Sequence, residues 1–286
     1  MKKSIYLFAI LIVYFLPANA QKITLTKVWE SDTTLRTAES VLLDPKTNFL
    51  YVSCINGKPS LENQSSFISK VDQKGKVLKL KFTEGLNSIK GMGISGDKLY
   101  VTEMTNVVEI ALSTGKILKR YAVTGAQFLN DITVDSKTGI VYISDSGTSK
   151  IWTLKKGVID LFTEGSPLQG INGLLIENNQ LLIGNGDGSL YSINLSSKKL
   201  TTVAKVSGGI DGVISYGNKK YIVSEWHGKV WAIGSTGNTQ LLFDTVKEKI
   251  NSADIEYNPK TQILYVPTFF KNTVKAYNVK FVWAKK

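Results

Sequence analysis

The chain has 286 residues, 43% of them apolar, so it can form one large packed domain and is not a disordered polypeptide. Its formal net charge is +12, but the lysines are scattered among apolar positions and form no basic helix or tract, which argues against nucleic-acid binding. The single cysteine, Cys54, excludes an intramolecular disulfide. Its position in the alternating stretch LYVSCING favours a small packed hydrophobe over a catalytic thiol.

Residues 1–20 have the parts of a secretory signal peptide. Lys2 and Lys3 are followed by an apolar run from Ile5 to Leu16 and then by Ala18-x-Ala20. The alternative, an uncleaved membrane anchor, is disfavoured because the run is short for a bilayer. We therefore expect cleavage after Ala20, export to the periplasm or medium, no stable membrane insertion afterwards, and a mature domain of residues 21–286.

Six similar segments follow one another along the mature chain. They begin at Glu39, Lys90, Asn130, Asn172, Asp211 and Ala253. Each predicts a short apolar strand, a turn rich in Gly, Asn, Asp or Pro, a second strand such as LYVS or VYIS, and a third strand such as KIWTL. A more polar stretch such as GVIDLFTEG supplies a fourth strand, and no sustained helical period is present.

Repeats of about forty residues with four short strands are typical of β-propeller blades. The sequence therefore predicts an all-β, six-bladed β-propeller as a single domain. The first repeat is about ten residues longer than the others, and the excess is placed in the polar stretch INGKPSLENQSS. The stretch Lys22–Ser31 is predicted to join the last blade as an additional strand, which would close the ring and remove a sheet edge.

The start of each first strand is the place where a site is expected. These strands line the channel of a propeller and run in the same direction, so their first residues form a ring at one mouth. Four ring positions hold oxygen ligands suited to a Ca²⁺-like cation: Glu39, Asn130, Asn172 and Asp211. The absence of His and Cys from the ring disfavours zinc or copper. The alternative is that these side chains only hydrate the channel or cap strands.

The turn after each second strand should lie at the same mouth. These turns carry Glu103, Asp145, Asn185, Asp187, Glu225 and His227. Lys90 adds a cation to the ring, either as a substrate contact or as a partner in a channel-wall ion pair. His227, the only histidine, is either a surface residue or a substrate contact. Asp131 and Asp254 follow ring positions and are expected to be structural carboxylates.

The ring motifs resemble those of the gluconolactonase/regucalcin (senescence marker protein-like) family, with a more distant resemblance to paraoxonases and strictosidine synthase-like proteins. The motifs are Glu39-Ser-Val, Asn130-Asp131, Asn172-Gly173-Leu174 and Asp211-Gly212-Val213. The resemblance implies a six-bladed, calcium-dependent propeller in which Glu39, Asn172 and Asp211 ligate the cation. Asn130 would contact the metal, its bound water or the substrate. Animal gluconolactonases have Arg where this chain has Phe128, so a sugar lactone is a doubtful substrate.

The resemblance also implies an activity, the hydrolysis of a lactone or related ester by a monomer acting on a small molecule. Asp211 is the first candidate for the proton acceptor and Asp145 the second. Substrate contacts are expected from Lys90, Glu103, Phe128, Asn130 and His227. Two other classes remain open, a secreted ligand- or partner-binding propeller with a structural cation, and a scaffold without a metal.

Overall fold

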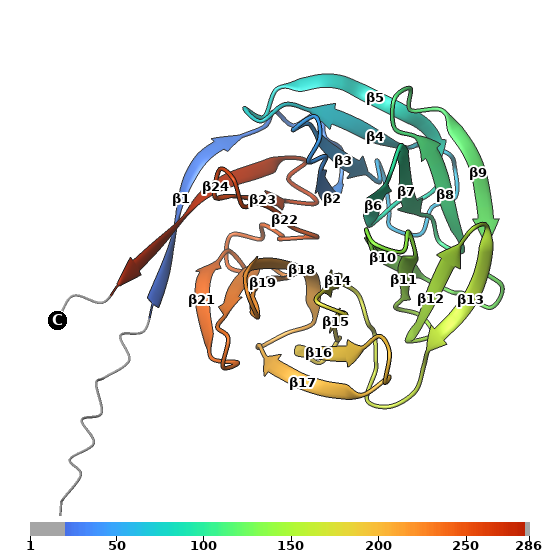
Figure 1. Ribbon diagram of the computed structural model, residues 1–286. Coiled ribbons are helices and arrows are strands. Elements are labelled where there is room, and N and C mark those ends of the chain that lie inside the picture. Colours follow the sequence, from blue (N-terminus) through green and yellow to red (C-terminus); the bar gives the residue numbers. More distant parts are fainter. Residues whose placement is uncertain (1–20, 284–286) are drawn as a thin grey trace, which may run out of the picture.

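The computed structural model describes residues 21–283, which form six four-stranded antiparallel sheets around a central axis (Figure 1). Each sheet is one blade, and its strands follow one another in chain order from the axis outward. Blades one to three are β2 (Ala38–Leu43), β3 (Leu50–Cys54), β4 (Ser66–Val71), β5 (Val77–Leu86); β6 (Met92–Ser95), β7 (Lys98–Thr102), β8 (Asn106–Ala111), β9 (Ile117–Ala122); and β10 (Leu129–Val134), β11 (Val141–Asp145), β12 (Lys150–Lys155), β13 (Val158–Thr163).

The remaining blades repeat the plan, except that the last one takes its outer strand from the other end of the chain. Blades four to six are β14 (Leu174–Glu177), β15 (Gln180–Gly184), β16 (Ser189–Asn194), β17 (Leu200–Lys205); β18 (Ile210–Gly217), β19 (Lys220–Glu225), β20 (Lys229–Ile233), β21 (Thr239–Asp244); and β22 (Glu256–Asn258), β23 (Ile263–Pro267), β24 (Val274–Trp283), β1 (Gln21–Glu30). The predicted all-β, six-bladed propeller is confirmed.

The ring is closed as predicted, because β1 pairs antiparallel with β24 along its whole length. β1 also reaches both neighbouring blades. The backbone of Ile23 exchanges two hydrogen bonds with the amide of Gln240 in blade five. The indole N–H of Trp29 donates to the carbonyl of Gln73 in blade one at 2.9 Å. One strand therefore joins blades five, six and one.

Six clusters of the hydrophobic core are each formed by two neighbouring blades. For example, Cys54 and Phe67 of blade one pack with Tyr265 and Ala276 of blade six, and the same arrangement recurs around the ring. Cys54 is fully buried, and burial raises the pKa of its thiol to about 12. It packs as the small hydrophobe that its strand position predicts.

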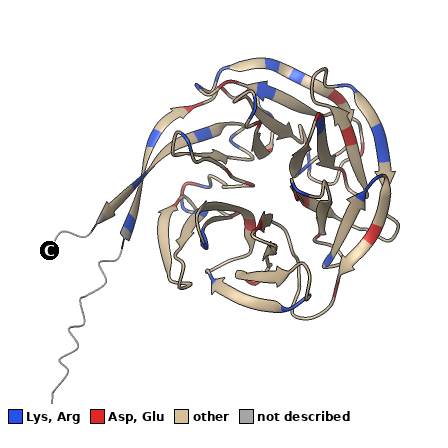
Figure 2. Cartoon of the chain, viewed as in Figure 1, with Lys and Arg blue, Asp and Glu red and all other residues tan. Residues whose placement is uncertain are grey.

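Charge is distributed differently on the outer and inner strands. Lysine and arginine lie along the outer strands, as β5 and β9 show clearly in Figure 2. Lys79, Lys81 and Lys119 are exposed there, as expected for edge strands that avoid pairing with other chains. Residues 21–283 include no helix that could cross a membrane. The predicted signal peptide lies outside the described residues.

Three acids in or just before the inner strands link neighbouring blades, Asp131 being buried and Asp254 and Glu256 half-buried. Asp131 Oδ2 accepts the backbone N–H of Leu174 at 2.6 Å, and Asp254 Oδ2 accepts the hydroxyl of Ser40 at 2.6 Å. The third is Glu256 in β22, whose Oε2 accepts the N–H of Leu43 from blade one at 3.0 Å. Burial raises the pKa of Asp131 to about 8 and that of Glu256 to about 7. These acids link the strands of the channel wall by hydrogen bonding, and burial disfavours their ionised forms.

Glu256→Gln should change how stability depends on pH. The pKa of Glu256 is about 7 in the folded protein against a usual 4.5, so its contribution to stability is fully present below pH 4.5 and is lost as pH rises through 7. The glutamine side chain of the variant cannot ionise. In urea unfolding, the parent minus variant difference should fall by about 3 kcal/mol between pH 4.5 and 8, since one pKa unit corresponds to about 1.4 kcal/mol. A difference that stays constant with pH would show that Glu256 is ionised at no cost.

Candidate functional site

Five of the six ring residues line one cavity of about 250 Å³ at a mouth of the central channel. They are Glu39, Lys90, Asn130, Asn172 and Asp211. We call these five residues the polar floor. Phe128, the sixth predicted residue that the structure brings here, also lines this cavity, and Ala253 lies beside it in a small apolar cluster.

The inner strands position the polar floor through irregularities at their first residues. The pairing of inner and second strands shifts register between Ala38 and Ser40, around Glu39. The same shift occurs around Asn130 and around Asp211. A bulge of this kind bends the strand and redirects one side chain. Glycine follows three ring positions because neighbouring inner strands approach closely, and a Cβ on Gly173 would lie 2.4 Å from the carbonyl oxygen of Asp211.

The two carboxylates of the floor are buried and only partly hydrogen-bonded. Asp211 Oδ1 accepts a hydrogen bond from the amide of Asn172. Glu39 Oε2 and Asp211 Oδ2 are buried and have no hydrogen-bond partner within residues 21–283. Burial raises the pKa of Asp211 to about 7. Burial, with the neighbouring charge of Asp211, raises the pKa of Glu39 well above its usual value. Orphaned buried oxygens are costly, and a cation between them would compensate both.

Lys90 is the cation of the floor and is itself buried. Its ammonium donates to the carbonyl of Ser88 at 2.9 Å and lies 4.2 Å from the ring centroid of Phe128. Burial lowers its pKa to about 8, although the charge of Glu39 acts in the opposite direction. The positive charge therefore lies over the face of Phe128 and close enough to Glu39 for their charges to interact.

The donor set of the floor fits a hard cation better than a transition metal. Within residues 21–283, no three His, Cys, Asp or Glu side chains lie close enough to hold a metal ion by themselves. Any site here must therefore use the amides of Asn130 and Asn172 beside the two carboxylates. The amide nitrogen of Asn130 donates to Ser146 Oγ at 3.1 Å, which fixes this side chain in the cavity wall. Carboxylate and amide oxygens are the ligands that Ca²⁺ prefers.

The polar residues at the ends of the second strands bind backbone N–H groups and do not line the cavity where the sequence predicted them. In four blades, the residue at this position accepts a backbone N–H from the linker that leads into the inner strand of the same blade. Acceptors and donors are Glu103 with Asn87, Asp145 with Gln127 and Phe128, Asn185 with Gln169, and Glu225 with Gly208. None of these acceptors lines the cavity of the polar floor. In each of these blades they hold the linker in place by hydrogen bonding. A structural residue that recurs from blade to blade produces the same sequence pattern as a ring of site residues.

Asp145 illustrates why such a residue is poorly placed to accept a proton from a substrate. It is fully buried, and its two oxygens accept four backbone N–H groups and the hydroxyl of Thr148 at 2.6 Å. Its influence on the cavity passes through Phe128, whose N–H it accepts at 2.9 Å. Glu103 is similarly occupied, by Asn87 and by Arg120 at 3.3 Å. Both lie behind the cavity wall.

Asp145→Ala should therefore destabilise the fold without abolishing cation binding. Removing a buried acceptor of several hydrogen bonds is expected to cost about 3–5 kcal/mol. The measurement is urea unfolding beside a calcium titration of the folded variant. Asp160→Ala, an exposed acid of the same blade, is the matched control and should be neutral. A stable Asp145→Ala protein that fails to bind calcium would return Asp145 to the site.

Four apolar residues of the cavity were not anticipated from the sequence. Ile55 and Pro59 come from the loop between β3 and β4, Trp226 follows β19, and Phe269 follows β23. They lie in loops that do not repeat between blades, so the blade period gives no signal for them. His227 is exposed, packs edge-on against Trp226 at 5.2 Å and does not line the cavity.

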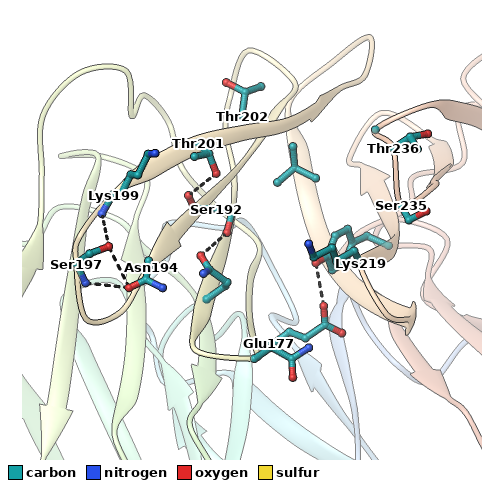
Figure 3. Close-up of a pocket in the computed structure, with 15 residues that line it drawn as sticks. Glu177, Ser192, Asn194, Ser197, Lys199, Thr201, Thr202, Lys219, Ser235 and Thr236 are labelled. Atoms are coloured by element: carbon teal, nitrogen blue, oxygen red, sulfur yellow. Dashed lines mark hydrogen bonds between the residues drawn. The ribbon is translucent and has the colours of Figure 1, made fainter.

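A larger cavity of about 610 Å³ lies between blades four and five, where the polar floor contributes nothing (Figure 3). Its polar side chains bond mainly to one another. Ser192 Oγ donates to Gln180 at 2.9 Å, and Glu177 accepts hydroxyls from Ser215 and Tyr221. Since these groups already have partners, this cavity gives no comparable argument for a ligand.

The fold and cavity define a six-bladed β-propeller with a polar site at one mouth of its channel. No protein-family model matches the chain, and no curated protein matches it. Among solved structures, a selenomethionine-substituted virginiamycin B lyase from Staphylococcus aureus covers 90% of this chain and 99% of its own, with a TM-score of 0.63 and 15% identity. A catalytically inactive histidine-to-alanine variant of that lyase with quinupristin covers 91% and 99%, with a TM-score of 0.62 and 14% identity. Likeness at this identity shows the propeller fold, and membership of the gluconolactonase/regucalcin family remains a prediction.

Proposed function

We propose that this protein is an exported, divalent-cation-dependent hydrolase of lactones or related esters, with Ca²⁺ held by the polar floor. The observation that carries the proposal is a pair of buried oxygens, Glu39 Oε2 and Asp211 Oδ2, which have no hydrogen-bond partner among residues 21–283 and share one cavity with two amides. The resemblance of the ring motifs to the gluconolactonase/regucalcin family supports the same assignment. Export rests on the signal-peptide pattern of residues 1–20.

The ligand set we propose is Glu39, Asn172 and Asp211, with Asn130 directed to the cation or to a water or substrate beside it. A cation bound there would polarise an ester carbonyl and acidify a nearby water. The role of this chain is to hold the ester carbon near an acceptor for the proton of that water. We assign proton acceptance to Asp211 rather than Asp145, because Asp211 lines the cavity and the oxygens of Asp145 are occupied.

Lys90 has a distinct part in this proposal. Hydrolysis of an ester or lactone releases a carboxylate, and Lys90 is the basic side chain that lines the cavity within the described residues. Its ammonium would bind the carboxylate as it forms and balance the charges of the floor. A substrate that already carries one negative charge would use the same contact.

The test uses the mature chain, residues 21–286. Calcium, manganese, magnesium and zinc binding are measured by calorimetry, and a panel of lactones and aryl esters is assayed with and without chelator. Asp211→Ala and Asn172→Ala should remove both cation binding and turnover, by about a hundredfold or more in kcat/KM. Asp187→Asn, in a mouth turn that does not line the cavity, is the matched control. Tight cation binding without turnover would favour the second candidate, a ligand-binding propeller with a structural cation. Intact protein that binds no cation would exclude both.

A further inference from the structure

The cavity has two halves of opposite character. Besides the five residues of the polar floor, the cavity is lined by five apolar side chains, which we call the apolar wall. The apolar wall consists of Ile55, Pro59, Phe128, Trp226 and Phe269. These residues come from blades one, three, five and six, so the wall partly encircles the floor. A ligand held by the floor would be forced to place the rest of its surface against the wall.

Part of the wall belongs to a small hydrophobic cluster where blades one, five and six meet. Six clusters account for the contacts between neighbouring blades, and a seventh, separate cluster contains Ile55, Ala253 and Phe269 with Trp226 packed against them. The Trp226 ring meets the Phe269 ring edge-on, with centroids 5.3 Å apart. Ile55 and Phe269 are almost fully buried and Trp226 is half-buried, so the Trp226 ring offers most of the surface of this cluster that a ligand in the cavity could contact.

Phe269 is held in an unfavourable backbone conformation. Its φ is 49°, a left-handed value that a bulky aromatic residue rarely adopts. The turn is fixed by the bond from Phe269 N–H to the carbonyl of Ala38 at 3.1 Å and by paired hydroxyls of Thr268 and Thr273. Fourteen other non-glycine residues also have a positive φ, so the value describes a turn and does not by itself mark a site. Here the result of the turn is a buried aromatic ring placed against the cavity.

The size and polarity of the cavity restrict what can bind. An apolar cavity of about 150 Å³ holds one benzene ring, so about 250 Å³ accommodates a small lactone ring and one substituent of phenyl size. A polyhydroxylated lactone would leave hydroxyls against the wall without partners, because none of its five side chains except the Trp226 indole carries a hydrogen-bonding group. The wall therefore selects against sugar lactones.

We propose that the substrates are lactones or esters carrying an aromatic or similarly large apolar substituent, which packs on the apolar wall while the ester group meets the polar floor. This inference rests on the proposed function for the reaction and on the wall for the selectivity. Trp226 and Phe269 are its specificity-determining residues.

The kinetic test compares γ-phenyl-γ-butyrolactone with γ-butyrolactone, which lacks only the phenyl ring, and with a tetrahydroxylated δ-lactone. Burial of the phenyl group should raise kcat/KM by roughly 30-fold or more. Phe269→Ala and Trp226→Leu should reduce this ratio to a few-fold, because the phenyl group loses its apolar contact. Leu161→Ala, an exposed apolar residue of β13 that does not line the cavity, is the control and should keep the ratio. Equal kcat/KM for the two butyrolactones would overturn the inference, as would preference for the hydroxylated lactone.

A binding test separates this inference from the proposed function. 2-Phenyltetrahydrofuran has no carbonyl, cannot be hydrolysed and offers a cation only an ether oxygen. With chelator present, saturation-transfer NMR should detect binding of 2-phenyltetrahydrofuran to the parent protein. Tetrahydrofuran should not bind, and Trp226→Leu should bind the phenyl ether more weakly. Binding of the phenyl ether without turnover of any lactone would preserve the apolar subsite and reject the hydrolase. If lactones are hydrolysed but the phenyl ether does not bind and phenyl lactones are not preferred, the hydrolase is supported and the apolar subsite is rejected.

Discussion

Deletion of residues 21–31 should unfold the protein or leave a species that no longer unfolds cooperatively. The deletion removes β1, so β24 loses its partner along the whole strand and the last blade exposes a long unpaired edge. It also removes the bonds to Gln240 in blade five and Gln73 in blade one. We expect a loss of more than about 5 kcal/mol, which is comparable to the total stability of many domains. Urea unfolding followed by tryptophan fluorescence and circular dichroism measures the loss.

Point variants within β1 separate closure from a general effect of truncation. Ile23 is 3% exposed and belongs to the core between blades five and six, whereas Val28 on the same strand is 54% exposed. Ile23→Ser should cost about 3 kcal/mol, and Val28→Ser less than about 0.5 kcal/mol. If the deleted protein kept the parent midpoint and cooperativity, the ring would be held by its inter-blade cores alone.

The fold could be predicted because the repeat is a property of the whole chain. Six similar starts at about forty-residue intervals determine the number of blades, and the orphan stretch before the first repeat determines how the ring closes. The same phase places Glu39, Asn130, Asn172 and Asp211 at one mouth. All four do line one cavity. Position in a repeat is thus sufficient to group residues at one end of a propeller.

Repeat phase does not indicate the direction in which a side chain points. Glu103 and Asp145 occupy the predicted end of their strands, but their carboxylates turn toward the backbone of the adjoining linkers. Any blade needs some acceptor for these N–H groups, and an acid provides it. The apolar wall could not be predicted because its residues do not follow the repeat. Trp226 and Phe269 lie in loops of unrelated sequence, so their proximity depends on tertiary structure.

Without a cation, the buried acids of the polar floor should make the parent protein less stable than a variant that lacks one of their charges. Burial raises the pKa of Asp211 from 3.8 to about 7, so its favourable contribution is fully present below pH 3.8 and is lost as pH rises through 7. Near pH 8 the buried charge is uncompensated. Asp211→Asn keeps the Oδ1 acceptor for Asn172 and removes the charge. In the presence of chelator at pH 8, the variant should therefore be more stable than the parent, by up to about 4 kcal/mol.

Calcium should reverse this order, because a cation that binds only the folded parent stabilises it by mass action. At a concentration about one hundred times Kd the gain is about 2.7 kcal/mol, and Asp211→Asn or Glu39→Gln should lose most of it because each removes a charged ligand. Thermal unfolding of the parent and both variants, each with chelator and with calcium at pH 8, provides the measurement. A parent that is more stable than Asp211→Asn even with chelator would show that the buried acids are compensated within the protein. The polar floor would then not need a cation. If these acids form a cation site, Asp211→Asn must be the more stable protein with chelator and the parent the more stable protein with calcium.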